Sequence, residues 1–132
     1  MDDPYAIAVF ALAALDAAEP DLARDAIERL RGLARDERGA MFWRLDSNTP
    51  FYGWGRAGTI ETTALAVTAL VRWRKLGASN QELDRLIDRG ALFLLRSKDE
   101  YGTWRSTQAT IRVFEALGEA LDLGKSAAAG IG

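Results

Sequence analysis

The residue types that most often carry out thiol, acyl-transfer or metal chemistry are missing from this sequence of 132 residues. It contains no Cys and no His, which excludes thiol nucleophiles, His-based triads and nearly all protein-bound zinc. The remaining candidates are carboxylates and amides, above all Glu61 and Gln108, which hold equivalent places in two similar segments. Neither has a second acid or base in a recognisable pairing. We therefore predict no catalytic residue, no cofactor, no bound metal and no enzymatic activity.

The same residue types also suit structural roles. Glu61 and Gln108 fall near expected helix starts, where a carboxylate or amide can accept from free backbone N–H groups. Trp43, Trp54 and Trp104 could stack on a ligand or line a groove. A Trp in a glycine-containing turn before a helix more often fills the gap between neighbouring helix pairs. The structural interpretation is favoured for all of these residues.

Composition limits the classes of partner. The chain has 17 Lys and Arg against 19 Asp and Glu, a net charge of −2, so no basic surface predicts nucleic-acid binding. A hydrophobic content of 48% with 27% charged residues is typical of one globular domain. The uncharged run at 5–15 has 11 residues, about half the ~20 of a membrane span. Asp2 and Asp3 precede it, so we expect no signal peptide in this chain.

Five helices position these residues. Asp3 followed by Pro4 predicts an N-cap and a first helix to about residue 18, and Pro20 opens a second that runs to about Glu37. After an irregular stretch at 39–58, a third helix is predicted over 59–76 and a fourth from the capping box at 79–82. A fifth covers 106–123. We assign 1–124 to one domain and expect the small-residue tail at 125–132 to be a fragment end.

An internal repeat connects the third and fifth helices. Glu61 and Gln108 stand near their starts, and an Ala-Leu pair follows eight residues later in each, which gives an offset of 47 residues. The Ala-Leu pair at 14–15 is a looser third copy at an offset of 55. Because the first and third helices carry uncharged runs while the second and fourth are charged on one side, the first, third and fifth are predicted to form an inner layer. Repeats of this kind form a solenoid or a closed α/α toroid.

A partial ring leaves some apolar surface bare. We expect its inner face to lose part of its packing and to be covered by a second copy, as a homo-oligomer, or by a missing half of the ring. The residues of that predicted inner face are Ile7, Phe10, Val67, Leu70, Val113 and Phe114.

Three segments carry a resemblance to a known family. Residues 3–8, 60–66 and above all 102–110, followed by 113–117, resemble the alpha-2-macroglobulin and complement thioester-containing domain in order and spacing, over about residues 3–121. The resemblance implies an all-α fold, the second half of an α/α toroid with roughly a dozen helices. The family-motif residues, to which it gives a structural role, are Trp43, Glu61, Gly102, Trp104, Ser106, Thr107, Gln108 and Thr110.

What the resemblance implies about function is a non-catalytic fragment of a protease-trapping or complement-like protein that serves as scaffold and interaction surface. The thioester Cys and Gln and the assisting His of that family precede the matched region, so no catalytic residue carries over. The implied partners are the remainder of the parent chain and, beyond it, proteases or target surfaces. The parent is expected to be secreted, periplasmic or membrane-anchored.

The alternative is a fragment of a terpene-cyclase or prenyltransferase-like toroid with an apolar lipid-binding pocket. Residues 89–93 and 102–104 resemble the repeat motif of that group, although Lys98 stands where the motif prefers Gln. A cyclase of this type needs an Asp-rich acid motif and a prenyltransferase needs zinc with Cys and His ligands. The acidic pairs at 2–3 and 99–100 supply neither.

Overall fold

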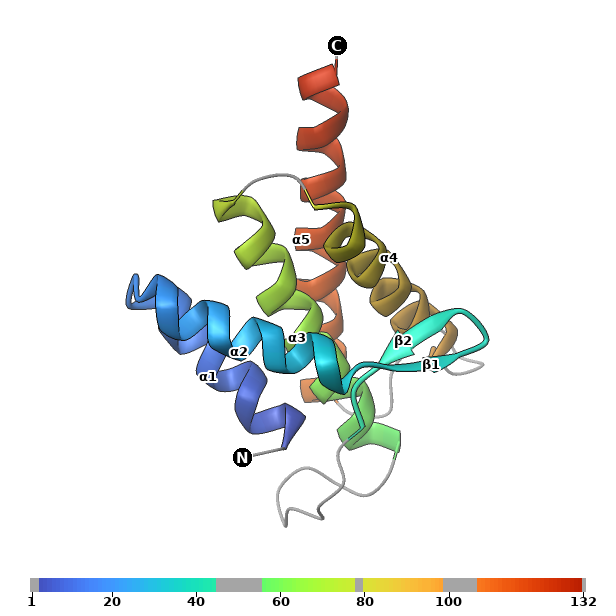
Figure 1. Cartoon of the computed structure of the whole chain (residues 1–132). Helices are drawn as coiled ribbons and strands as arrows, with labels where there is room; N and C mark the ends of the chain where they lie inside the picture. Colours follow the sequence, from blue (N-terminus) through green and yellow to red (C-terminus); the bar gives the residue numbers. More distant parts are fainter. Residues whose placement is uncertain (1–2, 45–55, 78–79, 99–106, 132) are drawn as a thin grey trace.

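In the computed structural model, three helices lie side by side and two more pack on them (Figure 1). The structure describes residues 3–44, 56–77, 80–98 and 107–131. The chain order is α1 (Pro4–Asp16), α2 (Pro20–Leu33), β1 (Arg35–Glu37), β2 (Ala40–Phe42), α3 (Arg56–Leu76), α4 (Gln81–Arg96) and α5 (Thr107–Ile131).

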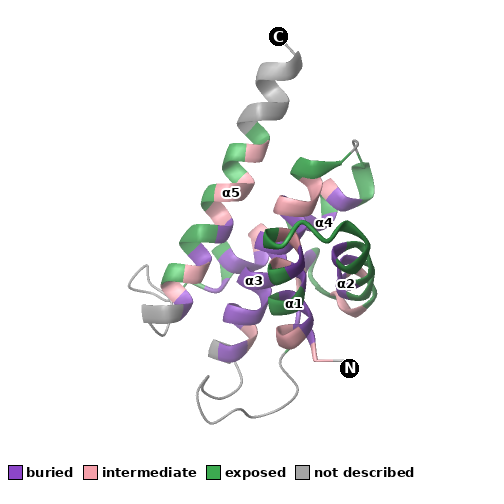
Figure 2. Cartoon of the chain, turned by 90° about the vertical axis from the view of Figure 1, so that its left-hand side faces the viewer, coloured by how far each residue is buried: buried purple, intermediate pink, exposed green. Residues whose placement is uncertain are grey.

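The central helix, α3, defines the two layers. Residues 60–71 are buried without exception, because α1 and α5 pack on opposite flanks of α3 while α2 and α4 cover a further side. Figure 2 shows buried residues concentrated on α3 and on the helix faces turned toward it. The prediction of an inner layer of α1, α3 and α5 with α2 and α4 outside is confirmed. The fold is all-α and toroid-like.

Helix α1 begins as the sequence predicts. The Asp3 carboxylate accepts from the backbone N–H of Tyr5 at 3.1 Å, and Pro4 is the first helical residue. This satisfies one of the free N–H groups of the first turn. The helix ends at Asp16, two residues before the predicted end, and Ala18 takes a positive φ of 56° in the turn to α2.

The predicted capping box at the start of α4 is wrong in its register. The N-cap is Asn80, whose side-chain oxygen accepts from the Leu83 N–H at 3.1 Å. Asn accepts this bond as well as Ser does, and from position 80 it lies three residues before Leu83. Glu82 consequently lies in the first turn of the helix, two residues after the cap.

Helix α2 ends at Leu33, so its predicted extension to Glu37 is wrong. Ala34 is extended, and β1 and β2 form an antiparallel hairpin in which Glu37 pairs with Ala40. The turn residues Arg38 and Gly39 both have positive φ, 54° and 85°, as a two-residue type I′ turn requires. Within the described residues this hairpin is the whole of the β-structure, and β2 packs on α4.

Helices α3 and α5 are longer than predicted. Helix α3 begins at Arg56 instead of residue 59, and α5 continues from Thr107 to Ile131, past the predicted end at Leu123. Gly124 does not stop α5, because it takes no positive φ, and the Ala residues at 127–129 favour helix. The domain boundary at 124 stays a prediction.

The expectation of a bare inner face is wrong for four of its six residues. Ile7, Val67, Leu70 and Val113 are buried in the core. Phe10 and Phe114, in contrast, are 50% and 62% exposed. The exposed apolar surface therefore lies at the two outer flanks of the inner layer, on α1 and α5.

In the part of the chain that the structure describes, no helix combines the length and the apolar character needed to cross a membrane.

Candidate functional site

Only part of the predicted motif set can be located. Gly102, Trp104 and Ser106 lie outside the described residues. Thr107 and Gln108 fall in the first turn of α5, with side chains outside the described set, and Thr110 is half-buried one turn later. Trp43 and Glu61 are fully described. The role of the motif as a set therefore stays a prediction.

Trp43 lies where α2, α3 and α4 meet. Its indole N–H donates to the carbonyl of Leu30 at 2.7 Å, and its backbone N–H donates to the hydroxyl of Thr63 at 3.0 Å. The ring also lies close to Gly90 of α4, where an added Cβ would be 3.6 Å from the ring carbon Cζ3. Trp43 is completely buried, so it joins three helices through one side chain and its backbone.

Gly90 allows α3 and α4 to approach closely. A Cβ at this position would stand only 2.6 Å from Cγ2 of Val67, far inside van der Waals contact. The outer helix α4 can therefore press directly against α3 only with Gly at this point. Beside it, Phe42 of the hairpin stacks on Phe93 of α4 with ring centroids 5.1 Å apart.

Glu61 is a buried carboxylate in the second turn of α3. The early start of α3 at Arg56 removes Glu61 from the N-terminal capping position that the sequence predicts. The side chain is only 4% exposed, and Oε1 has no hydrogen-bond partner among the described residues. Burial raises the pKa of Glu61, and the charge of Arg112 on α5 opposes that rise. At neutral pH, the protonated and ionised forms of Glu61 are therefore closer in free energy than those of an exposed Glu.

A seam of alternating charge joins α3 to α5. Arg72 of α3 pairs with Glu119 of α5 at 3.0 Å, and Lys75 of α3 pairs with Asp122 of α5 at 3.2 Å. Within α5, Arg112 pairs with Glu115 at 3.5 Å. The hydrogen bond that Arg72 donates to Glu119 raises the pKa of Arg72; burial opposes that rise, and the charges of Glu119, Asp16 and Glu115 add to it. We call this set the charged seam; it consists of Arg72, Lys75, Arg112, Glu115, Glu119 and Asp122.

The sequence contains a signal for this seam that composition alone does not reveal. Two of its pairs join residues separated by 47 positions, the offset of the repeat between the third and fifth helices. Opposite charges at positions i and i+47 therefore predict the pairing once the helices are taken to lie parallel. The helical pattern by itself does not, because it leaves their direction open.

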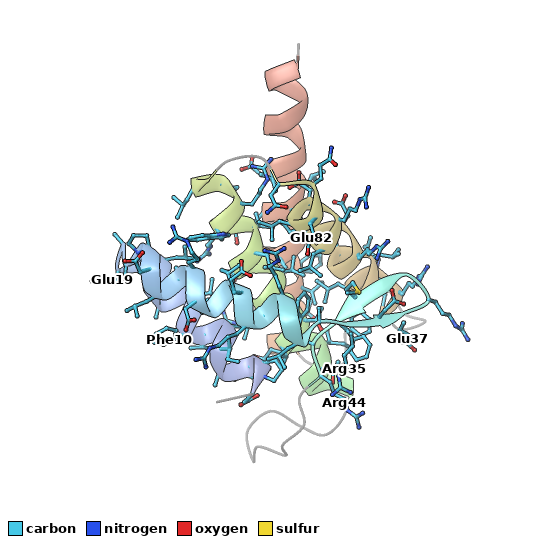
Figure 3. All side chains as sticks on the ribbon, in the orientation of Figure 1. Phe10, Glu19, Arg35, Glu37, Arg44 and Glu82 are labelled. Carbon is cyan, nitrogen blue, oxygen red and sulfur yellow. The ribbon has the colours of Figure 1, made fainter. Side chains whose placement is uncertain are left out.

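An apolar groove lies along the outer flank of α1. It has a volume of about 660 Å³ and is lined on the α1 side by side chains that include Val9, Phe10 and Ala13, and on the α2 side by Asp25 and Arg29. Figure 3 shows Phe10 on the side of the α1–α2 pair that faces away from α3. The rim pair Asp25 and Arg29 is joined across one turn at 3.4 Å.

The acidic residues that the structure describes are spread over the fold. Among the residues that the structure describes, no three acidic side chains gather closely enough to hold a metal ion. Glu61 faces Arg112 instead of a second carboxylate, so no acid–base couple is formed there. The described residues form a layered helical framework with an apolar groove beside α1 and exposed apolar side chains on α5.

The inner and outer helix layers, the parallel α3 and α5 and the repeat that relates them define a helical toroid-type domain. A family model for the A-macroglobulin TED domain matches residues 1–119. The chain belongs to this family, and its expected resemblance to the alpha-2-macroglobulin and complement thioester-containing domain is confirmed. It matches no curated protein sequence.

Proposed function

We propose that this chain is a non-catalytic part of an alpha-2-macroglobulin-like protein and that it works as a scaffold and interaction surface. The observation that carries the proposal is the family match over residues 1–119 in a chain that has no Cys. Because the thioester implied by the resemblance requires a Cys thiolate, this chain cannot form that bond by itself. Its contribution to the parent protein is therefore to provide a structural framework and a binding surface.

The described contacts support a scaffold role. Trp43 fixes three helices at one point, and the charged seam fixes the position of α5 along α3. These contacts hold the outer faces of the helices in fixed positions relative to one another. The partners in this proposal are the remainder of the parent macroglobulin-like chain and, through it, proteases or target surfaces. The parent protein is proposed to be secreted, periplasmic or membrane-anchored.

The toroid with a lipid-binding pocket is the weaker alternative. The apolar groove beside α1 would suit a lipid, but the matched family is the macroglobulin one. Binding of a fluorescent fatty acid that Phe10→Glu abolishes would favour the alternative.

The experiment that tests the proposal measures covalent and inhibitory activity of the chain alone. After incubation with methylamine or with active trypsin, the intact mass is expected to be unshifted apart from proteolysis, and trypsin activity on a protein substrate is expected to be unchanged. A stable amide or ester adduct would contradict a non-catalytic role. Inhibition of trypsin by the chain alone would contradict a scaffold role, because trapping would then need no other part of the parent.

A further inference from the structure

Three buried polar atoms on α3 and α5 are unsatisfied among the described residues. They are Oε1 of Glu61, Nε of Arg112 and Oε2 of Glu119, each without a hydrogen-bond partner there. Buried polar atoms are normally hydrogen-bonded, so each exception needs a physical explanation. Two of the three are a carboxylate oxygen and a guanidinium N–H group, which would satisfy each other in a strong, charge-assisted bond if they met.

Arg112 lies between two carboxylates along the contact of α3 with α5. Paired positions on the two helices differ by 47 residues, and subtracting 47 from 112 places Arg112 level with Leu65. Glu61 is then one helical turn away, about 6 Å along the axis. Long helical side chains lean toward the N-terminal turn of their own helix, which directs Arg112 toward the level of Glu61. Glu115 lies three residues further along α5, so the guanidinium has a carboxylate on either side.

The bond that Arg112 makes in the structure is a weak one. Its Nη1 lies 3.5 Å from Oε2 of Glu115, whereas the Arg72–Glu119 bond has a length of 3.0 Å. The side chains of Arg112 and Glu115 are 39% and 46% exposed, and an exposed ion pair within one helix contributes little to stability. Arg112 can therefore leave Glu115 with only a small loss of free energy.

Three carboxylates, those of Glu61, Glu115 and Glu119, share two guanidinium groups. Arg72 bonds to Glu119, and the charge of Glu115 also acts on Arg72. One carboxylate is therefore always left without a guanidinium of its own. An unpaired charge is least favourable where it is buried, and Glu61 is only 4% exposed, so Glu61 is the carboxylate that binds a proton most readily. Burial raises the pKa of Glu61 accordingly, against the opposing charge of Arg112.

We propose that Arg112 is a two-position switch controlled by the proton on Glu61. With Glu61 protonated, Arg112 bonds to Glu115, which is the arrangement in the structure. When Glu61 loses its proton, the Nε–H of Arg112 turns to the Glu61 carboxylate, and Glu115 is released at the surface of α5. A proton bound inside the domain thereby changes the charge on its outside. This inference goes beyond the proposed function and does not rest on it.

The other charges near α3 leave this coupling direct. Among the described residues of α1, α2, β2, α4 and α5, which all pack on α3, Arg112 has the charge that acts on Glu61. Helix α1 has no charged residue over 5–15, and Asp16 at its end acts on Arg72. The position of Arg112 and the protonation of Glu61 are therefore linked: a contact with Arg112 favours the ionised form, and protonation releases Arg112.

The Nε resonance of Arg112 tests the switch directly. It is assigned in carbon-detected NMR spectra of the full chain by its absence in Arg112→Lys, and followed from about pH 5, above the ordinary carboxyl range, to about pH 9, below the ordinary lysine range. The resonance is expected to shift in one transition, which Glu61→Gln abolishes. Glu82→Gln is the matched control and should leave the transition unchanged, because Glu82 is exposed and paired with Arg31. A resonance that does not titrate, or that titrates equally in Glu61→Gln, would overturn the proposal.

A double-mutant cycle distinguishes a change of partner from a distant charge effect. Arg112→Gln and Glu115→Gln are combined, and their coupling is measured by urea unfolding at both ends of the pH range. The coupling is expected to change the folding equilibrium constant about twofold at the acid end and to vanish at the alkaline end, where Arg112 has left Glu115. This cycle needs no change at the buried Glu61, and both replaced side chains are partly exposed, so the variants should fold. An equal coupling at both ends would overturn the switch. The proposed scaffold function would survive that result.

Discussion

Arg72 and Glu119 stand 47 residues apart, and the guanidinium Nε of one lies 3.0 Å from the carboxylate Oε1 of the other. Lys75 and Asp122 repeat the same separation at 3.2 Å. The offset is that of the internal repeat in the sequence. Equivalent positions of the two repeats therefore face each other, and α3 and α5 lie parallel without stagger.

The Arg72–Glu119 pair should contribute measurably to stability. The two side chains are 39% and 25% exposed, so solvent screens the pair only in part. A double-mutant cycle with Arg72→Ala and Glu119→Ala, measured by urea unfolding, is expected to give a coupling free energy of about 0.5–1 kcal/mol. The matched control is the Asp21–Arg24 pair, which is 94% and 62% exposed and should give a coupling near zero. Equal couplings would contradict this account of the charged seam.

Gly90 should be intolerant of even one added methyl group. Gly90→Ala would bring its Cβ to 2.6 Å from Val67 Cγ2, and overpacking of this kind typically destabilises by about 1–3 kcal/mol. Adding Val67→Ala should recover part of that loss, which thermal unfolding of the double variant can measure. Gly124→Ala is the control, because nothing lies within 4 Å of its Cβ position. It should stabilise α5 by up to about 1 kcal/mol.

Replacing Trp43 should loosen three helices together. Trp43→Phe keeps part of the ring but leaves the Leu30 carbonyl without its indole donor, and an unsatisfied buried acceptor together with the lost volume should destabilise by about 2–4 kcal/mol. Trp73→Phe is the comparison. Trp73 is half-buried, with the Arg24 guanidinium 5.9 Å from its ring centroid, so a loss below about 1 kcal/mol is expected. A similar loss in both variants would mean that Trp43 is not a junction.

Glu61 should make stability depend on pH in an unusual direction. Its folded-state pKa is raised by burial, so the native state binds this proton more tightly than the unfolded state. The contribution is present in full below the unfolded pKa and is lost as the pH rises through the folded one. Glu61→Gln should remove this dependence and leave the chain at least as stable at neutral pH.

Urea unfolding of the parent and of Glu61→Gln at several pH values measures that difference. Glu82→Gln serves as the control, because Glu82 is exposed and already paired with Arg31. If Glu61→Gln instead strongly destabilised the chain at neutral pH, the charge attraction of Arg112 would outweigh burial, and the stated direction would be wrong.

Local chemistry explains which parts of the fold the sequence predicts. Asp3 and Pro4 begin α1 through a bond that needs only neighbouring residues, and the layers follow from which helices lack charge. The hairpin was not predictable in this way, since Arg35, Asp36 and Glu37 suit a helix equally well. It forms because Arg38 adopts a positive φ and because Phe42 stacks on Phe93, a contact 51 residues distant in the chain.

In the candidate site, too, local sequence patterns predict some features, while others depend on how the helices pack. The repeat predicts that Glu61 and Gln108 hold equivalent positions, but it predicts neither that α3 begins at Arg56 nor that Glu61 is buried. The apolar run in α1 predicts enclosure. The face of α1 that stays uncovered is set by the positions of α2 and α3. Hydrophobic periodicity cannot identify that face, because α1 is apolar on every side.

The common direction of the inner helices also has an electrostatic consequence. Peptide dipoles add along each helix, so parallel α1, α3 and α5 reinforce one another, and α2 and α4, which run back, cancel only part of the sum (Figure 1). One end of the domain is left with excess partial positive charge, where the Asp3 carboxylate lies, and the other with excess partial negative charge, where Arg74 and Lys75 end α3. The molecule is thus polarised from end to end, although its net charge is only −2.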